Sequence, residues 1–148
     1  MRKYLIVFLF LLPLSSIAQE SNYFVMLKNK KVNVRYGPSL DYPVKYVYRK
    51  IGLPLKVIDK KENFRRIIDH KKNSGWIHVS QLRPSHSLIV SSEKILFKKP
   101  TKYSKPLAKL DQGRLLKVIK CEEKWCNIKT GDYSGWIIKD DNIWGIRN

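Results

Sequence analysis

The segment GLPLKVI at residues 52–58 returns as GRLLKVI at residues 113–119, at an offset of 61. Two further blocks recur in the same order: ENFRRI at 62–67 with EKWCNI at 123–128, and SGWI at 74–77 with SGWI at 134–137. Three ordered matches, with length changes only between them, indicate that one structural unit occurs twice. The repeat therefore predicts two similar small domains.

Each unit consists of short β-rich runs separated by turn residues such as Gly37-Pro38-Ser39. The expected strands are 31–35, 44–48, 55–59, 64–69 and 76–79 in unit one, and 95–97, 107–110, 115–121, 125–130 and 135–138 in unit two. No segment after residue 20 has the length or period of a helix. Five short strands in about 55 residues are best covered when the sheet closes into a small barrel, because closure removes exposed edges. The predicted fold class is all-β, with two small barrels in tandem.

The first 18 residues have the pattern of a secretory signal peptide. Arg2 and Lys3 precede an apolar run at 4–14, and small residues at 16–18 end it. A retained membrane anchor is the alternative, but the run is shorter than the roughly 20 residues that span a bilayer. We therefore expect cleavage after Ala18, no transmembrane segment in the mature chain, and an exported protein, periplasmic or secreted.

The domain boundaries follow from the repeat and from a serine-rich stretch between its two copies. We place a short N-terminal extension at 19–26, domain 1 at 27–84, a linker at 85–92 and domain 2 at 93–148. Within the linker, Leu88-Ile89-Val90 is apolar, so an inter-domain strand is the alternative to a flexible connection.

The chain is strongly basic. Loss of Arg2 and Lys3 with the signal leaves 28 basic and 12 acidic residues, a net charge of +16. Residues 27–84 hold 15 basic and 4 acidic residues, and residues 85–148 hold 13 and 7, so domain 1 is the expected binder of an anionic partner. Such a charge attracts polyanions, which outside the cell are wall polymers, anionic lipid head groups and acidic proteins. We expect no nucleic acid partner, because of the predicted export.

Several motifs resemble a known family. VNVRYGPS at 32–39, then Gly52 and the pair Gly75-Trp76, is similar to the bacterial SH3-type domain. More narrowly, the chain resembles exported tandem SH3-like proteins of α-proteobacteria. The motifs that carry this resemblance are Asn33–Pro38, Tyr42-Pro43-Val44, Val47–Pro54, Gly75–His78, Cys121–Cys126, Tyr133–Trp136 and Trp144-Gly145. Unit two departs from the pattern at 96–100, where LFKKP replaces the NVRxGP motif.

The resemblance implies SH3-like barrels that act as binding modules, often for peptidoglycan. We therefore expect a non-catalytic module of the cell envelope that recognises peptidoglycan or another anionic surface polymer. The alternative is a protein–protein adaptor that docks an acidic partner. The sequence offers no paired carboxylates in a plausible cleft and no nucleophile with its base, so we expect no enzyme, no cofactor and no metal site.

Aromatic and basic residues of unit one form the candidate binding surface. The candidate residues are Arg35, Tyr36, Tyr42, Arg65, Arg66, Trp76 and His78. Tyr36 and Tyr42 flank the Gly37-Pro38 turn, as aromatics line peptide grooves of other SH3-like domains. The arginines could add a rim for carboxylates. For Trp76, which follows a glycine at a strand start, packing in the barrel core is the alternative.

The two cysteines, Cys121 and Cys126, flank a four-residue loop at a predicted hairpin tip. That loop places them opposite each other across two strands, at a separation that a disulfide can bridge. In an oxidising compartment we expect a disulfide, with free thiols as the alternative. Two thiolates without a nearby histidine are only half of a zinc site.

Overall fold

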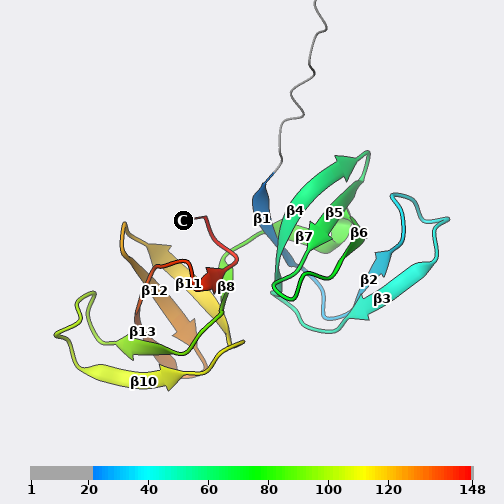
Figure 1. Cartoon of the computed structure of the whole chain (residues 1–148). Coiled ribbons are helices and arrows are strands. Elements are labelled where there is room, and N and C mark those ends of the chain that lie inside the picture. The colour runs from blue at the N-terminus through cyan, green and yellow to red at the C-terminus, as the bar shows by residue number, and fades with distance from the viewer. Residues whose placement is uncertain (1–21, 148) are drawn as a thin grey trace, which may run out of the picture.

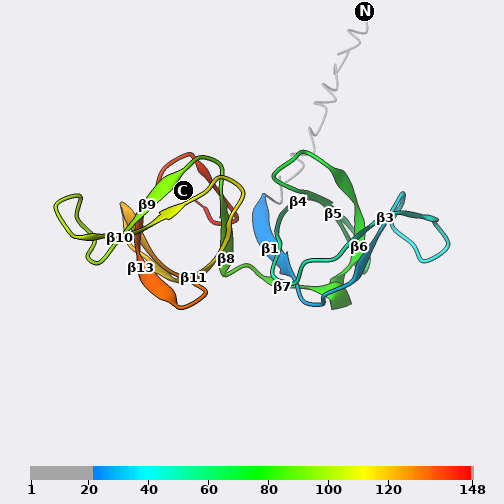
Figure 2. The same ribbon diagram turned by 90° about the horizontal axis from the view of Figure 1, so that it is seen from below.

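The computed structural model describes residues 22–147 and consists of two small β-barrels lying side by side (Figure 1). Each barrel is one seven-stranded antiparallel sheet, and Figure 2 shows both curled into rings. The predicted all-β fold of two tandem barrels is confirmed. The predicted signal peptide at 1–18 lies outside the described residues, as do residues 19–21 of the predicted extension.

Domain 1 has the sheet order β3-β2-β6-β5-β4-β1-β7. Its strands are β1 (Tyr23–Leu27), β2 (Val32–Arg35), β3 (Val44–Tyr48), β4 (Pro54–Lys61), β5 (Phe64–Ile68), β6 (Ser74–His78) and β7 (Leu82–Pro84). A short 3-10 helix, η1 (Val79–Gln81), joins β6 to β7.

Domain 2 repeats this topology with the order β10-β9-β13-β12-β11-β8-β14. Its strands are β8 (Ser87–Val90), β9 (Lys94–Phe97), β10 (Pro106–Leu110), β11 (Leu115–Cys121), β12 (Trp125–Thr130), β13 (Tyr133–Ile138) and β14 (Ile143–Trp144). Every strand of domain 2 occupies the place of the strand seven positions earlier, so the sequence repeat is a repeat of the whole barrel.

Two of the expected boundaries are corrected by the structure. Residues 23–27, assigned to an N-terminal extension, form β1, which pairs with β4 and β7 inside the domain 1 sheet. Residues 87–90, assigned to the linker, form β8, which pairs with β11 and β14 of domain 2. Both strands are nearly continuous apolar runs without the polar–apolar alternation of a half-exposed strand, because both of their faces are covered.

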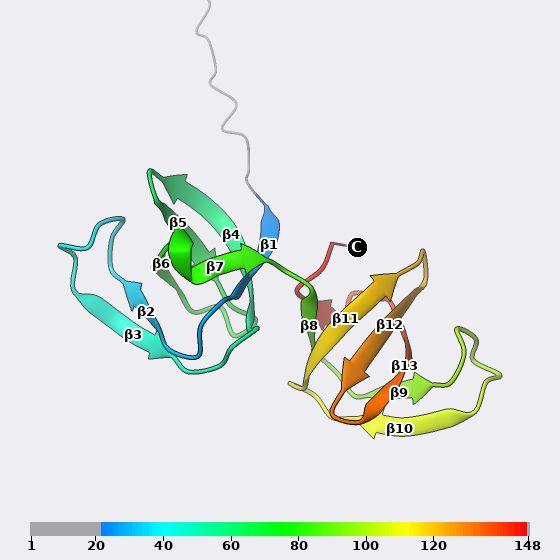
Figure 3. The same cartoon turned by 180° about the vertical axis from the view of Figure 1, so that it is seen from behind.

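The second face of each of these strands is covered by the other barrel. In β8, Leu88 and Val90 belong to the domain 2 core, whereas Ile89 lies in the domain 1 core and is 2 % exposed. In β1, the Phe24 ring meets the Trp144 ring edge-on at 5.2 Å. Figure 3 shows β8 entering domain 2 directly beside domain 1.

Hydrogen bonds fix the same junction. Trp144 Nε1 donates to the Pro54 carbonyl at 3.1 Å, and Ser87 Oγ donates to the Gly52 carbonyl at 2.5 Å. The ammonium group of Lys72, a residue of domain 1, lies 5.2 Å from the centre of the Trp144 ring. The two barrels therefore share buried apolar and polar contacts and are not joined by the connection alone.

Candidate functional site

The β2–β3 loop of domain 1, residues 36–43, is held in shape by its neighbours. One guanidinium nitrogen of Arg35 donates to the carbonyls of Leu40, at 3.2 Å, and Tyr42, at 2.7 Å. The Tyr42 ring lies over Gly37 so closely that a Cβ there would be 2.4 Å from it. Arg35 and Tyr42 therefore preform the loop that projects from the outer end of domain 1 (Figure 2).

A groove of about 570 Å³ lies between this loop and the segment formed by β6 and η1. We call it the domain 1 groove, and its lining residues are Lys31, Asn33, Arg35, Leu40, Phe64, His78, Ser80 and Gln81. Cationic and amide side chains thus surround an apolar patch made by Leu40 and Phe64. Such a mixture suits a peptide or glycan that presents both carboxylates and amides.

His78 lines this groove in a fixed orientation. Its ring meets the Phe64 ring edge-on at 5.2 Å. Its Nδ1 accepts a hydrogen bond from the backbone N–H of Ser80 at 3.2 Å and lies 2.8 Å from the Ser80 hydroxyl. Because Nδ1 is an acceptor here, the neutral ring bears its proton on Nε2. His78 therefore caps η1 and presents a fixed ring to the groove.

A second hollow of about 300 Å³ lies on the other side of Arg35. Its lining comprises Arg35, Tyr36, Lys45, Arg66, Ser74, Gly75 and Trp76. Gly75 is required for this arrangement, because a Cβ there would lie 2.3 Å from Val34 and block the approach of β2 to β6. The Lys45 ammonium lies 5.7 Å from the Tyr36 ring centre and donates to the Ser74 carbonyl.

The structure brings most of the predicted site residues together around Arg35. Tyr36, Arg66 and Trp76 line the second hollow, and His78 lines the domain 1 groove. Trp76 is half-buried and stands opposite Arg35 in the β2–β6 pairing. Tyr36 and Tyr42 are 60 % and 46 % exposed, and Tyr42 has the additional role of packing on the loop.

Arg65 is the exception. It lies in a different hollow, lined also by Tyr23 and Pro84, and its Nε donates to the Tyr23 hydroxyl at 3.3 Å. Successive residues of a strand point to opposite faces, so Arg65 and Arg66 could not both line one surface. The prediction that both arginines form one rim is therefore wrong.

Sequence reasoning missed several residues of the two hollows: Lys31, Asn33, Leu40, Lys45, Phe64, Ser74, Ser80 and Gln81. For Asn33 a signal was present, since it alternates with the buried Val32 and Val34 on the same strand as Arg35. For Ser80 and Gln81 there was none, because their position depends on how the segment after β6 folds back over the barrel.

A buried carboxylate, Asp69, stabilises the β5–β6 turn and links it to β3. Asp69 is 3 % exposed and accepts hydrogen bonds from the Tyr48 hydroxyl, the Asn73 side chain and the backbone N–H groups of Lys71 and Asn73. Burial alone would raise the pKa of Asp69, but these hydrogen bonds together lower it below its usual range. Burial, reinforced by Tyr46 and Asp69, raises the pKa of Tyr48 far above its usual value.

Domain 2 presents a different loop at the equivalent place. The β9–β10 loop, residues 98–105, contains Lys98, Lys99, Lys102 and Lys105 and no acidic residue. Tyr103 at its tip is 99 % exposed. The two loops project from opposite ends of the molecule (Figure 2). Although domain 1 has the higher net charge, the loop with the most lysines among the described residues is therefore in domain 2.

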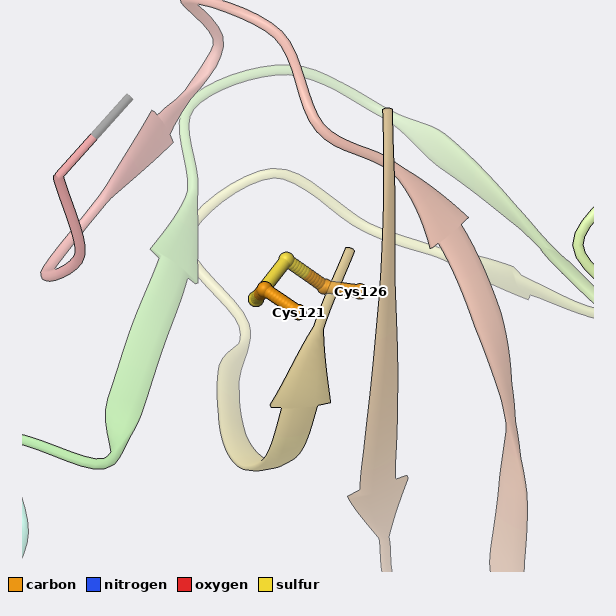
Figure 4. Close-up of a disulfide and its surroundings, with 2 residues drawn as sticks. All are labelled: Cys121 and Cys126. Carbon is orange, nitrogen blue, oxygen red and sulfur yellow. A yellow bond between two sulfur atoms is a disulfide. The ribbon is translucent and has the colours of Figure 1, made fainter. Parts of the chain in front are cut away.

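The predicted disulfide is confirmed. Cys121 and Cys126 are bonded, face each other in the β11–β12 pairing and have their Cα atoms 4.1 Å apart (Figure 4). The bond closes the hairpin tip, beyond the irregularity in register between Val118 and Lys120. It therefore holds the end of a hairpin whose pairing is interrupted below it.

Comparison with protein families agrees with the doubled barrel. The profile of the bacterial SH3 domain matches the chain twice, at residues 28–84 and at residues 90–145. The chain belongs to the bacterial SH3 domain family. Each of its two bacterial SH3 domains covers one of the barrels described above. No curated protein matches the chain.

Among solved structures, the tandem bacterial SH3 domains are similar to NlpC2 from Trichomonas vaginalis, with 12% identity and a TM-score of 0.38 over 84% of this chain and 48% of that one. NlpC1 from the same organism matches with 12% identity and a TM-score of 0.38, over 86% of this chain and 47% of that one. An NlpC/P60 family protein from Bacillus cereus matches with 10% identity and a TM-score of 0.37, over 83% and 57%. The chain spans about half the length of these proteins.

Within residues 22–147 no helix is long and apolar enough to cross a membrane. The same residues contain no group of three or more His, Cys, Asp or Glu side chains placed to hold a metal ion.

Proposed function

We propose that this protein is an exported, non-catalytic binding module of the cell envelope, which recognises peptidoglycan or another anionic surface polymer through the domain 1 groove. The observation that supports it most is the composition of that groove on a bacterial SH3 domain. Lys31 and Arg35 supply positive charge, Asn33 and Gln81 supply amide hydrogen bonds, and Leu40 with Phe64 supplies an apolar patch.

Each of these groups has a counterpart in a wall peptide. Carboxylates pair with the cations, backbone amides pair with the side-chain amides, and small apolar side chains rest on Leu40 and Phe64. The groove wall is already ordered by the Arg35 and Tyr42 contacts described above. A preformed site loses less conformational entropy on binding, so modest contacts suffice for useful affinity.

The non-catalytic role depends on how the pair His78 and Ser80 is interpreted. Their 2.8 Å contact is the distance at which a base activates a serine nucleophile. Here the same imidazole nitrogen accepts the Ser80 backbone N–H, and the Ser80 hydroxyl accepts from Gln81 Nε2 at 3.1 Å. These are the local contacts of a cap on η1, so we assign the pair to structure. Release of soluble fragments from sacculi by the purified protein, abolished in Ser80→Ala, would contradict this assignment.

Co-sedimentation with purified sacculi tests the binding role. Leu40→Ala and Lys31→Gln each change an exposed side chain of the domain 1 groove without removing a hydrogen-bonding group that orders the loop. Truncation of a hot-spot residue at the centre of an interface costs more than 1 kcal/mol, so at such a residue we expect about a fivefold or greater loss of affinity. Arg35→Ala is less informative, because it also releases the loop.

The matched control is Ile119→Ala. Ile119 lies on β11 of domain 2 and is 54 % exposed, against 68 % for Leu40. Binding should weaken as salt rises and be unchanged in the control. Equal binding by the wild type and the site variants, or no binding at low salt, would refute the proposed site.

An adaptor that docks an acidic protein is the second candidate. It is supported by the β9–β10 loop, where four lysines surround the fully exposed Tyr103. Exposed aromatic and basic side chains at one tip are typical of a docking surface for an acidic partner. Inert sacculi, together with loss of one acidic envelope partner in Tyr103→Ala, would favour this candidate.

A further inference from the structure

A pocket of about 360 Å³ lies where the two barrels meet. Its apolar part is formed by Met26 of β1 and by Leu115 and Leu116 of β11. Its polar part includes Arg83 of β7, together with Lys117 of β11 and Lys129 of β12. Both domains thus contribute to one concave site, and junctions between domains are a preferred place for ligand sites.

The two lysines of this pocket oppose each other directly. Lys117 and Lys129 are register partners in the β11–β12 pairing. Like charges directly across an antiparallel pair destabilise a sheet. In domain 1 the equivalent pair is Lys56 with Ile68, so the barrel itself does not require a second lysine.

No ion pair among the described residues neutralises these charges. Among residues 22–147 the ion pairs are Lys94–Asp140, Lys109–Glu93 and Lys120–Glu122, none of which involves a cation of the pocket. No acidic side chain is among the described residues that line it.

The pocket walls are held in place by the junction. Ser87 Oγ, at its base, donates to the Gly52 carbonyl at 2.5 Å and thereby ties domain 2 to domain 1. Figure 3 shows the β7–β8 connection passing from one barrel to the other at this point. At the far side, Arg114 Nε donates to the Thr130 hydroxyl at 3.0 Å. The cations are therefore presented by fixed strands from both barrels.

We propose that this inter-domain pocket binds an anionic ligand group, a phosphate or a carboxylate, between Arg83, Lys117 and Lys129. The anion removes the repulsion between the two lysines and bridges the barrels. The site is separate from the domain 1 groove, and either can exist without the other.

Two simple probes test the proposal at low ionic strength: inorganic pyrophosphate for phosphate groups and citrate for carboxylates. Calorimetric titration of the wild-type protein should show one site for at least one probe, and the preferred probe identifies the chemistry. Lys117→Gln/Lys129→Gln should weaken that binding at least tenfold. The control Lys28→Gln/Lys30→Gln removes the same charge from an exposed turn outside the pocket and should bind as the wild type does.

Thermal unfolding tests the proposal in a second way, because the double substitution should raise stability while it weakens anion binding. Without a probe, the Lys117→Gln/Lys129→Gln variant should melt about 1–3 °C higher than the wild type, because the cross-strand repulsion is gone. With the probe, the wild type should gain melting temperature and the variant should not. Absence of binding by both probes, equal loss in the control variant, or a lower melting point of the ligand-free pocket variant would each overturn the proposal.

Discussion

Ile89 tests whether the two barrels are one structural unit. The residue belongs to β8 of the domain 2 sheet, yet its side chain is 2 % exposed in the core of domain 1. Ile89→Ala removes apolar contacts from a site that the surrounding β-sheet cannot easily close. Core truncations of this kind cost 2–5 kcal/mol, and we expect about 3 kcal/mol here.

A cost of that size lowers the melting temperature of a chain of this length by roughly 10 °C. The more informative measurement is hydrogen–deuterium exchange, which reports stability segment by segment. Ile89→Ala should speed exchange in β4 and β5 of domain 1 as well as in β11 of domain 2. The control Ile119→Ala, on a side chain that is 54 % exposed, should change stability by less than about 0.5 kcal/mol.

Faster exchange confined to domain 2, or two separate unfolding transitions of the wild type in urea, would show that the two barrels are not one structural unit. Either result would mean that the shared contacts at β8 and Trp144 contribute little to the free energy of unfolding, and that the barrels fold as independent domains.

Three further predictions concern single contacts. The lowered pKa of Asp69 means that its stabilising contribution is present above about pH 4, the usual pKa in an unfolded chain, and is lost as the pH falls through the lower folded pKa. The urea midpoints of wild type and Asp69→Asn should therefore differ at pH 7 and approach each other as the pH is lowered below about 4. The Lys94 ammonium, whose side chain is 7 % exposed, bonds both carboxylate oxygens of Asp140, whose side chain is 39 % exposed. Asp140→Asn leaves a buried charge without its partner and should cost about 3 kcal/mol of unfolding free energy in chemical denaturation, whereas Lys94→Met should be nearly neutral. Equal costs would contradict this prediction. Reduction of the Cys121–Cys126 disulfide opens a short loop and should lower the free energy of unfolding by about 2 kcal/mol, seen as a lower melting temperature in reducing buffer. An unchanged melting temperature would show that the hairpin tip does not contribute to global stability.

The repeated motifs were sufficient to predict the doubled barrel, because turn glycines and apolar alternation are local properties of the chain. The disulfide could be predicted for the same reason, since a hairpin with four residues between its cysteines can adopt few conformations. Strand β1 escaped prediction, and a strand at β8 was only the alternative to a flexible linker, both for a non-local reason. Their apolar runs have no period of two, and only the contact between the barrels explains why both faces are buried.

The candidate site also has a part that the sequence could predict and a part that it could not. Tyr36, Trp76 and His78 stand next to glycine motifs that mark strand and loop ends, so sequence pointed to them. The separation of Arg65 from Arg66 followed from strand alternation and could have been foreseen. The inter-domain pocket could not, because Arg83 and Lys117 meet only through the packing of one barrel on the other.

The most direct test of domain 1 as the binding barrel is an amide NMR titration of the purified protein with soluble peptidoglycan fragments from digested sacculi. Saturable shifts should cluster at the domain 1 groove, on the amides of Lys31, Asn33 and Ser80, with the β9–β10 loop unchanged. No saturable shifts, or shifts confined to residues 98–105, would contradict the claim that domain 1 is the binding barrel.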